Sequence, residues 1–210
     1  MSKVTIQGDA SGTGIFTIAS PNSNTDRTLV LPDEAGTVLT SAGVPASAMP
    51  AGSVLQVVQV VKTNAFAGSA GAQWADVSGL SATITPTSAS NKVLVIVDMK
   101  GGGTADATTV RSRLVRNTTP IYFGDAAGVR PLGMGEFYIS AGGAGSLYLA
   151  QLGGSFVDSP ASTSPVTYKM QFGADNNTYV VYINRTQGDR NTTGTDVRSA
   201  SSIILMEIAA

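Results

Sequence analysis

Apolar and polar residues alternate in the C-terminal part of the chain. Tyr168, Met170 and Phe172 fall on one face of an extended segment, and polar residues occupy the positions between them. This period of two is typical of a β-strand with one buried face. A second alternating segment, 179–183, follows a turn-forming stretch. The pair predicts a β-hairpin at about 166–184.

The same pattern predicts strands along most of the chain after the first quarter. The segment Val93–Met99 places an apolar side chain at every second position, and the β-branched segment 202–209 is expected to close a sheet. The run Gly101–Gly103 is interpreted as a flexible turn between strands. Further strands are expected near 53–62, 74–85, 109–116, 119–124, 134–140 and 146–157.

The number and spacing of these segments predict the fold class. About eight short strands separated by glycine-, asparagine- and proline-rich breaks are typical of an all-β fold. We therefore expect a β-sandwich, with the jelly roll as its natural form. No window has the periodicity of an amphipathic helix of about ten residues or more. Because periodicity does not determine which strands pair, the strand order stays open.

Residues 1–51 differ in composition from the rest of the chain. They hold few large apolar side chains, and glycine and proline turns interrupt them. A segment of this size rarely forms its own core. We therefore expect an extended N-terminal arm over 1–51, with a linker at about 41–51, followed by a β-sandwich knob over 52–210. Other chains, as in a homotrimer, would bury the arm's apolar residues. These oligomer and anchor residues are Ile15, Phe16, Ile18, Leu29, Leu31, Val38 and Leu39.

The charge and the missing residue types narrow the function classes. The formal net charge is −1, which argues against electrostatic binding to nucleic acid or to an anionic membrane. The chain has no Cys and no His, so thiolate nucleophiles, Cys-ligated metals and the commonest general base are absent. The longest run of large apolar residues, Val93–Val97, is too short to cross a bilayer. With no apolar signal core after Met1, we expect folding in the cytoplasm and no membrane insertion.

Few residues suit catalysis or metal binding. Asp125 and Glu136 form the one carboxylate pair that a loop could bring together for glycan cleavage, but ordinary solvated carboxylates are the favoured interpretation. The segment Asp175–Asn177 offers oxygen ligands for Ca²⁺, although the same residues are common in turns. We expect no enzymatic activity, no metal and no cofactor.

Two arginines are candidates for a contact with an anionic group. Arg111 and Arg113 point to one side of a predicted strand. The alternative, which the sequence favours, is a pair of solvent-exposed arginines that contact aspartates. The segments 101–109, 123–135 and 187–196 are candidates for loops at an exposed tip.

Two stretches of the arm resemble a known group of proteins. Residues 12–18, GTGIFTI, and residues 25–40, TDRTLVLPDEAGTVLT, resemble the G-x-F-T-I and D-R-T-x-x-L-P-D-x-x-G-T-x-L stretches of bacteriophage virion proteins. This group comprises tail-fibre-like and related structural proteins, especially of marine and cyanobacterial phages. The segments 52–59 and 201–208 also resemble the C-terminal β-domain of the group.

The resemblance implies a non-enzymatic, trimeric component of a phage particle, assembled in the host cytoplasm. One hypothesis is a fibre or appendage subunit, anchored by its arm to capsid or tail proteins, whose outward β-domain binds a host-surface glycan. The alternative is a capsid decoration, or cement, protein that stabilises the head shell. A glycan-degrading enzyme is a third hypothesis, which the scarcity of Glu and the absence of His disfavour. A position on the head or on the tail stays open.

Overall fold

The chain divides into two compact units, residues 1–39 and 40–210. The structure, a computed structural model, describes residues 10–15, 17, 22–26, 28, 44–70, 73–104, 108–140, 147–176 and 178–210. The described residues of the first unit form turns and irregular chain. No helix among all these residues is long and apolar enough to cross a membrane.

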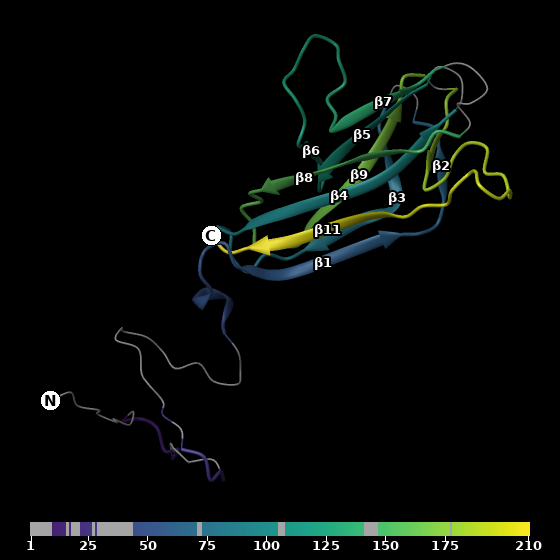
Figure 1. The fold of residues 1–210 in the computed structure, drawn as a ribbon. Coiled ribbons are helices and arrows are strands. Elements are labelled where there is room, and N and C mark those ends of the chain that lie inside the picture. The colour runs from purple at the N-terminus through teal and green to yellow at the C-terminus, as the bar shows by residue number, and fades with distance from the viewer. Residues whose placement is uncertain are drawn as a thin grey trace. The chain divides into compact units, whose positions relative to one another are not determined.

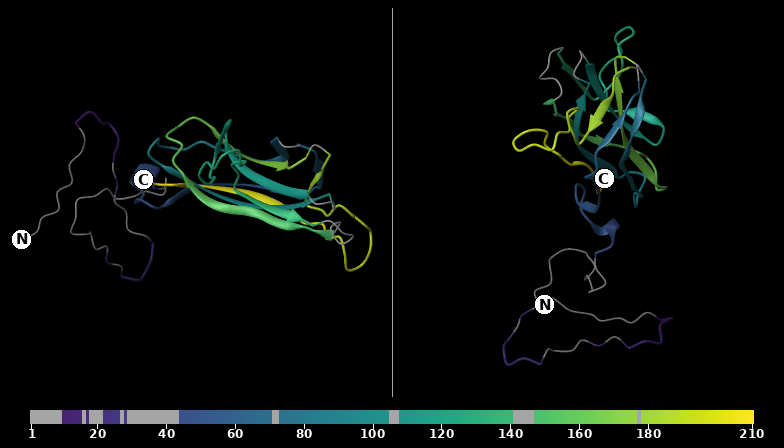
Figure 2. Two further views of the ribbon diagram at one scale, coloured as in Figure 1. Left: turned by 90° about the horizontal axis from the view of Figure 1, so that it is seen from above. Right: turned by 90° about the vertical axis from the view of Figure 1, so that its right-hand side faces the viewer.

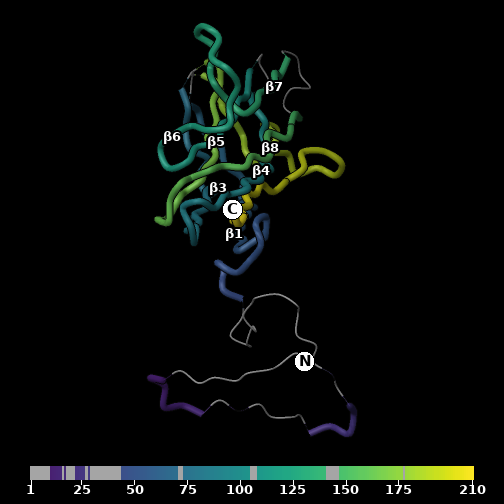
Figure 3. The backbone as a smooth tube through the Cα atoms, turned by 90° about the vertical axis from the view of Figure 1, so that its left-hand side faces the viewer, coloured from purple at the N-terminus to yellow at the C-terminus, as the bar shows by residue number. Residues whose placement is uncertain are grey.

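The second unit is a sandwich of two antiparallel sheets, sheet A and sheet B (Figure 1). Sheet A contains β1 (Val54–Lys62), β2 (Phe66–Gly68), β4 (Lys92–Gly103), β8 (Ala150–Asp158), β10 (Val181–Ile183) and β11 (Ser201–Ile208). Sheet B contains β3 (Ala75–Ile84), β5 (Thr108–Arg116), β6 (Thr119–Ile121), β7 (Gly135–Ile139) and β9 (Val166–Ala174). Figure 3 shows the sandwich from the end that holds the C-terminus.

Three pairs of consecutive strands each act as one interrupted strand. β10 and β11 both pair with β4, and β6 and β7 both pair with β5. β1 and β2 pair with β11 and β10 respectively, so they form the third interrupted strand. The described residues therefore form eight strand positions, ordered 1-8-3-6 in sheet A and 2-7-4-5 in sheet B. This is the order of a jelly roll, and it confirms the predicted all-β sandwich.

The core lies between the two sheets. Tyr168, Met170 and Phe172 of β9 are buried, which confirms that the alternating residues share an inward face. They meet the alternating valines of β4 and the inward residues Ile203 and Leu205 of β11. Period-two burial on strands of both sheets fills the sandwich with interdigitating apolar side chains.

The predicted hairpin at 166–184 is wrong. β9 pairs with β3 and β5 of sheet B, whereas β10 pairs with β2 and β4 of sheet A. The residues between them carry the chain from one sheet to the other. Turn-forming residues indicate that the chain changes direction. Which strand the next segment pairs with depends on the packing of the whole sandwich.

The interpretation of Gly101–Gly103 as a flexible turn is also wrong. These glycines form the end of β4 and pair with β10. A Cβ atom on Gly102 would lie 2.6 Å from the carbonyl oxygen of Tyr148, and one on Gly103 would lie 2.7 Å from Cγ2 of Val110. The glycines are needed because other atoms approach the strand closely.

The jelly roll begins and ends at the same end. The 3₁₀ turn η1 (Ala46–Ala48) precedes β1, so the segment expected to be an extended linker contains one helical turn. The Gly52 amide donates to the Ala209 carbonyl at 2.8 Å, and the Ala209 amide donates to the Ser53 carbonyl at 2.9 Å. The segment 184–200, which we call the β10–β11 loop, extends from the opposite end (Figures 1 and 2).

Candidate functional site

Part of the outer face of sheet A is apolar. The residues that alternate with the buried ones on β1, β11, β4 and β8 point away from the core. In one cross-strand row, Val57 lies beside Met206, Met206 beside Leu94, and Leu94 beside Val157. We call this surface the apolar face, and it comprises Val57, Val61, Leu94, Ile96, Val157, Ile204, Met206 and Ile208.

The apolar face is exposed where its strands lie at the sheet margins. Val57 is 56% exposed, and Val61 and Val157 are each 52% exposed. Four strands about 4.8 Å apart, over about eight residues that rise about 3.4 Å each, give the whole outer face of sheet A roughly 500 Å². The apolar face is only part of this area, because Gln59, Asp98 and Ser155 also point outward. Contiguous apolar patches larger than a few hundred Å² are typical of contact surfaces.

The outer face of sheet B is polar and laced with hydrogen bonds. The Gln171 amide donates to Asp76 at 2.6 Å, and Nε of Arg113 donates to the Gln171 side-chain oxygen at 2.7 Å. The Lys169 ammonium lies 2.7 Å from Asp76, and its hydrogen bond holds the pKa of the Asp76 carboxyl below its ordinary value. The two faces of the sandwich therefore differ in chemistry, so they suit different contacts.

Trp74 lies on the polar face beside the two candidate arginines. The guanidinium carbons of Arg113 and Arg111 are 4.5 Å and 5.6 Å from the centroid of its ring. The structure therefore places both arginines near the same ring. Nε of Arg113 donates to the side chain of Gln171 and not to an aspartate. Their contact with an anionic group stays a prediction. Sequence reasoning missed Trp74, although its status as the single tryptophan was a usable signal.

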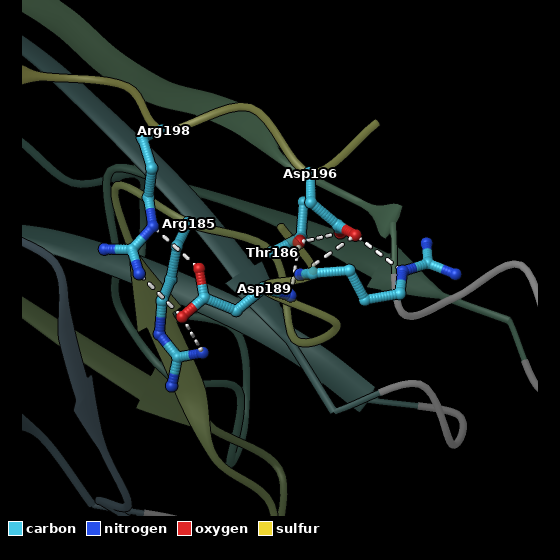
Figure 4. A network of polar contacts seen from close by, with 6 residues as sticks. Arg185, Thr186, Asp189, Asp196 and Arg198 are labelled. Atoms are coloured by element: carbon cyan, nitrogen blue, oxygen red, sulfur yellow. Dashed lines mark hydrogen bonds and ion pairs between the residues drawn. The ribbon is translucent and has the colours of Figure 1, made fainter. Parts of the chain in front are cut away.

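The β10–β11 loop is held by its own charges (Figure 4). Asp189 accepts from Arg198 at 2.7 Å and lies 3.2 Å from Arg185. Asp196 accepts from the hydroxyl of Thr186 and from Nε of Arg190, the latter at 2.6 Å. The Thr186 and Arg190 hydrogen bonds hold the pKa of Asp196 below its ordinary value. The loop therefore has a defined shape without regular secondary structure.

Other predicted positions have ordinary structural roles. Asp175 accepts from the backbone amide and the hydroxyl of Thr109, and Asn176 accepts from the Thr178 hydroxyl within its turn. Among the described residues, no three or more His, Cys, Asp or Glu side chains group to hold a metal ion. Of the predicted oligomer and anchor residues, Ile15 is 94% exposed. Phe16, Ile18, Leu29, Leu31, Val38 and Leu39 lie outside the described residues.

Comparison with known proteins gives distant similarities only. Neither a family model nor a curated protein matches the chain. Among solved structures, the chain is similar to a chain from the structure of infectious bursal disease virus, Gx strain. The two align at 10% identity with a TM-score of 0.37, over 75% of this chain and 43% of the viral chain. A mutant VP2 protein from T=1 particles of that virus aligns at 10% identity and a TM-score of 0.35, over 73% of this chain and 40% of that one.

The chain therefore spans less than half the length of either viral chain. The jelly-roll assignment rests on the strand pairing within the chain itself.

Proposed function

We propose that this chain is a structural subunit of a bacteriophage particle, and that copies of it associate through the apolar face of sheet A. The observation that carries the proposal is the row of apolar side chains from Val57 to Val157, whose two end residues are more than half exposed. Removing such a surface from water stabilises an assembly by about 25 cal/mol per Å². The resemblance of residues 12–40 to phage virion proteins supports the particle as the site of assembly.

The apolar face and the arm together would form the interface of a homotrimer. Stable interfaces bury about 800 Å² on each partner, so the apolar face supplies only part of one. The arm residues, from Ile15 to Leu39, would supply the remainder by contacting the same neighbours. In this arrangement the polar face of sheet B and the β10–β11 loop remain accessible, as an outward-facing fibre or appendage domain requires.

The test of the proposal is the mass of the protein in solution. We expect the 21.3 kDa chain to form a particle of about three times that mass in light scattering coupled to size-exclusion chromatography. The double variant Val57→Lys, Val157→Lys should be monomeric, because it places two charges on the apolar face at exposed positions that folding tolerates. The matched control Thr83→Lys, on the polar face, should retain the mass of the unmodified protein.

A monomeric unmodified protein, or a double variant with unchanged mass, would overturn the assembly through this face. A capsid decoration protein would use the same face, and it differs from a fibre in copy number. Quantitative mass spectrometry of purified particles separates the two, since decoration proteins follow the capsid lattice and fibres are far fewer.

A further inference from the structure

We propose that the pocket beside Trp74 binds an acidic saccharide, with the sugar carboxylate on the guanidinium of Arg111. The inference does not depend on the assembly through sheet A, because the pocket lies on the outer face of sheet B. It gives the predicted anionic contact of Arg111 a location and a class of ligand, whereas Arg113 lies on the same Trp74 ring but does not line the pocket.

The pocket has room for part of one sugar residue. Its volume is about 110 Å³, and its walls are Trp74, Arg111, Pro131, Gly133, Gly135 and Glu136. Water occupies about 30 Å³ per molecule in the liquid, so the pocket holds a carboxylate and the adjoining edge of a ring. It therefore suits recognition of one acidic residue on a longer glycan, with the rest of the glycan in solvent.

Arg111 is a buried cation without a charged partner. Arg111 is only 8% exposed, and one of its terminal guanidinium nitrogens donates to the Ala174 carbonyl. Nε is buried and has no hydrogen-bond partner. In the described part of the chain no carboxylate forms an ion pair with Arg111. Burial of an unpaired charge is costly, and a carboxylate that meets the planar guanidinium offsets the cost.

Glu136 selects the kind of anion. It lies directly opposite Arg111 in the pairing of β5 with β7, and its residue is exposed. Its carboxylate accepts hydrogen bonds from hydroxyl groups of the ligand. It repels any negative charge that the ligand carries in addition to the carboxylate bound to Arg111. A sugar with one carboxylate and several hydroxyls satisfies both Arg111 and Glu136, whereas a phosphate dianion does not.

Trp74 supplies apolar surface, and glycines leave room for its ring. A Cβ atom on Gly133 would lie 3.2 Å from Cη2 of Trp74, and one on Gly173 would lie 3.4 Å from Cε3. Aromatic surface with a few converging polar groups is typical of small-molecule sites. Arg111 is the cation in the wall of the pocket and has no carboxylate ion-pair partner among the described residues, so the pocket favours an anionic sugar over a neutral one.

The protein carries its own probe for this test, because Trp74 is its only tryptophan. Fluorescence of the full chain is measured during titration with sodium glucuronate, with glucose and with inorganic phosphate, at constant ionic strength. We expect a saturable change with glucuronate and at least tenfold weaker binding of glucose and of phosphate. Equal binding of glucuronate and glucose, equal binding of phosphate, or no saturable change with glucuronate would each overturn the proposal.

Variants assign the signal to the pocket. Arg111→Gln should weaken glucuronate binding at least tenfold, and Glu136→Ala, at an exposed position that folding tolerates, should weaken it severalfold. The control Lys92→Gln removes the same charge at an exposed site on sheet A and should bind as the unmodified protein does. Should Arg111→Gln fail to fold, Glu136→Ala decides: unchanged glucuronate binding by this variant would overturn the proposal.

Discussion

The side-chain amide of Asn91 donates to the carboxylate of Glu207 at 2.6 Å, and both residues are buried. Glu207 lies on an inward position of β11, where a charge is normally excluded. It is tolerated because Gln56 donates to it at 2.6 Å, and the amide and hydroxyl of Thr87 donate at 2.6 Å and 2.8 Å. The carboxylate thus joins the last strand to the first strand and to the segment after β3.

Acid should destabilise the jelly roll through Glu207. Burial alone raises the pKa of this carboxyl, but the hydrogen bonds from Gln56, Asn91 and Thr87 outweigh burial and hold the pKa below its ordinary value of 4.5. A lowered pKa in the folded state contributes stability that is present above the unfolded pKa and is lost as the pH falls through the folded pKa. Urea unfolding at a series of pH values should show this loss below about pH 4.5.

Glu207→Gln should separate this contribution from that of other carboxyls. At pH 7 the variant should lose about 1–3 kcal/mol of unfolding free energy, because its amide cannot accept all the bonds that the carboxylate accepts. At low pH, where Glu207 itself is protonated, the gap between the two proteins should narrow. A gap that is constant with pH would contradict the role of the charge.

Asn184 should be a critical residue at the base of the β10–β11 loop. Its amide donates to the carbonyls of Lys62 and Asn64, its side-chain oxygen accepts from Ser201 at 2.6 Å, and its φ of 63° is in the left-handed region. Asn184→Ala should cost about 2–4 kcal/mol in denaturant unfolding, since buried hydrogen bonds are lost and alanine is strained there. Asn184→Gly should cost less than Asn184→Ala. It loses the same hydrogen bonds, but glycine adopts the left-handed φ without strain.

Alanine at the end of β4 should destabilise the sandwich. Gly102→Ala and Gly103→Ala place Cβ atoms where other atoms already lie, and about 1–3 kcal/mol should be lost in each variant. Gly124→Ala is the matched control, because a Cβ atom at Gly124 would have no atom within 4 Å. In thermal unfolding, the control should have the same melting temperature as the unmodified protein, and the two β4 variants should melt at lower temperatures. Equal stability of all the variants would disprove the close-approach explanation.

The ordered shape of the β10–β11 loop should depend on Asp196. Asp196→Asn removes the charge that contacts Arg190 and weakens the bond from Thr186. Backbone amides of residues 186–196 should exchange faster with deuterated solvent, while the melting temperature of the domain stays the same. Asn191→Ala, at an exposed position of the same loop, is the control and should leave the exchange unchanged.

The positions of most strands followed from the sequence alone. Alternation is a local property, because successive side chains of an extended chain point to opposite faces. Tyr168, Met170 and Phe172 therefore revealed a buried face without any knowledge of its partners. The number and spacing of such segments were also enough to indicate a β-sandwich, since few other folds use so many short strands.

Only the tertiary structure decided which strands pair and which faces remain outside. The turn before β10 looked like a hairpin, but hydrogen bonding across the sandwich assigned β10 to the other sheet. Val57 and Val61 have the same sequence pattern as core valines, and they differ only because sheet A has no second layer on that side among the described residues. Trp74, just before β3, meets Arg111 and Arg113 of β5. Such contacts join residues far apart in the chain, so no local pattern encodes them.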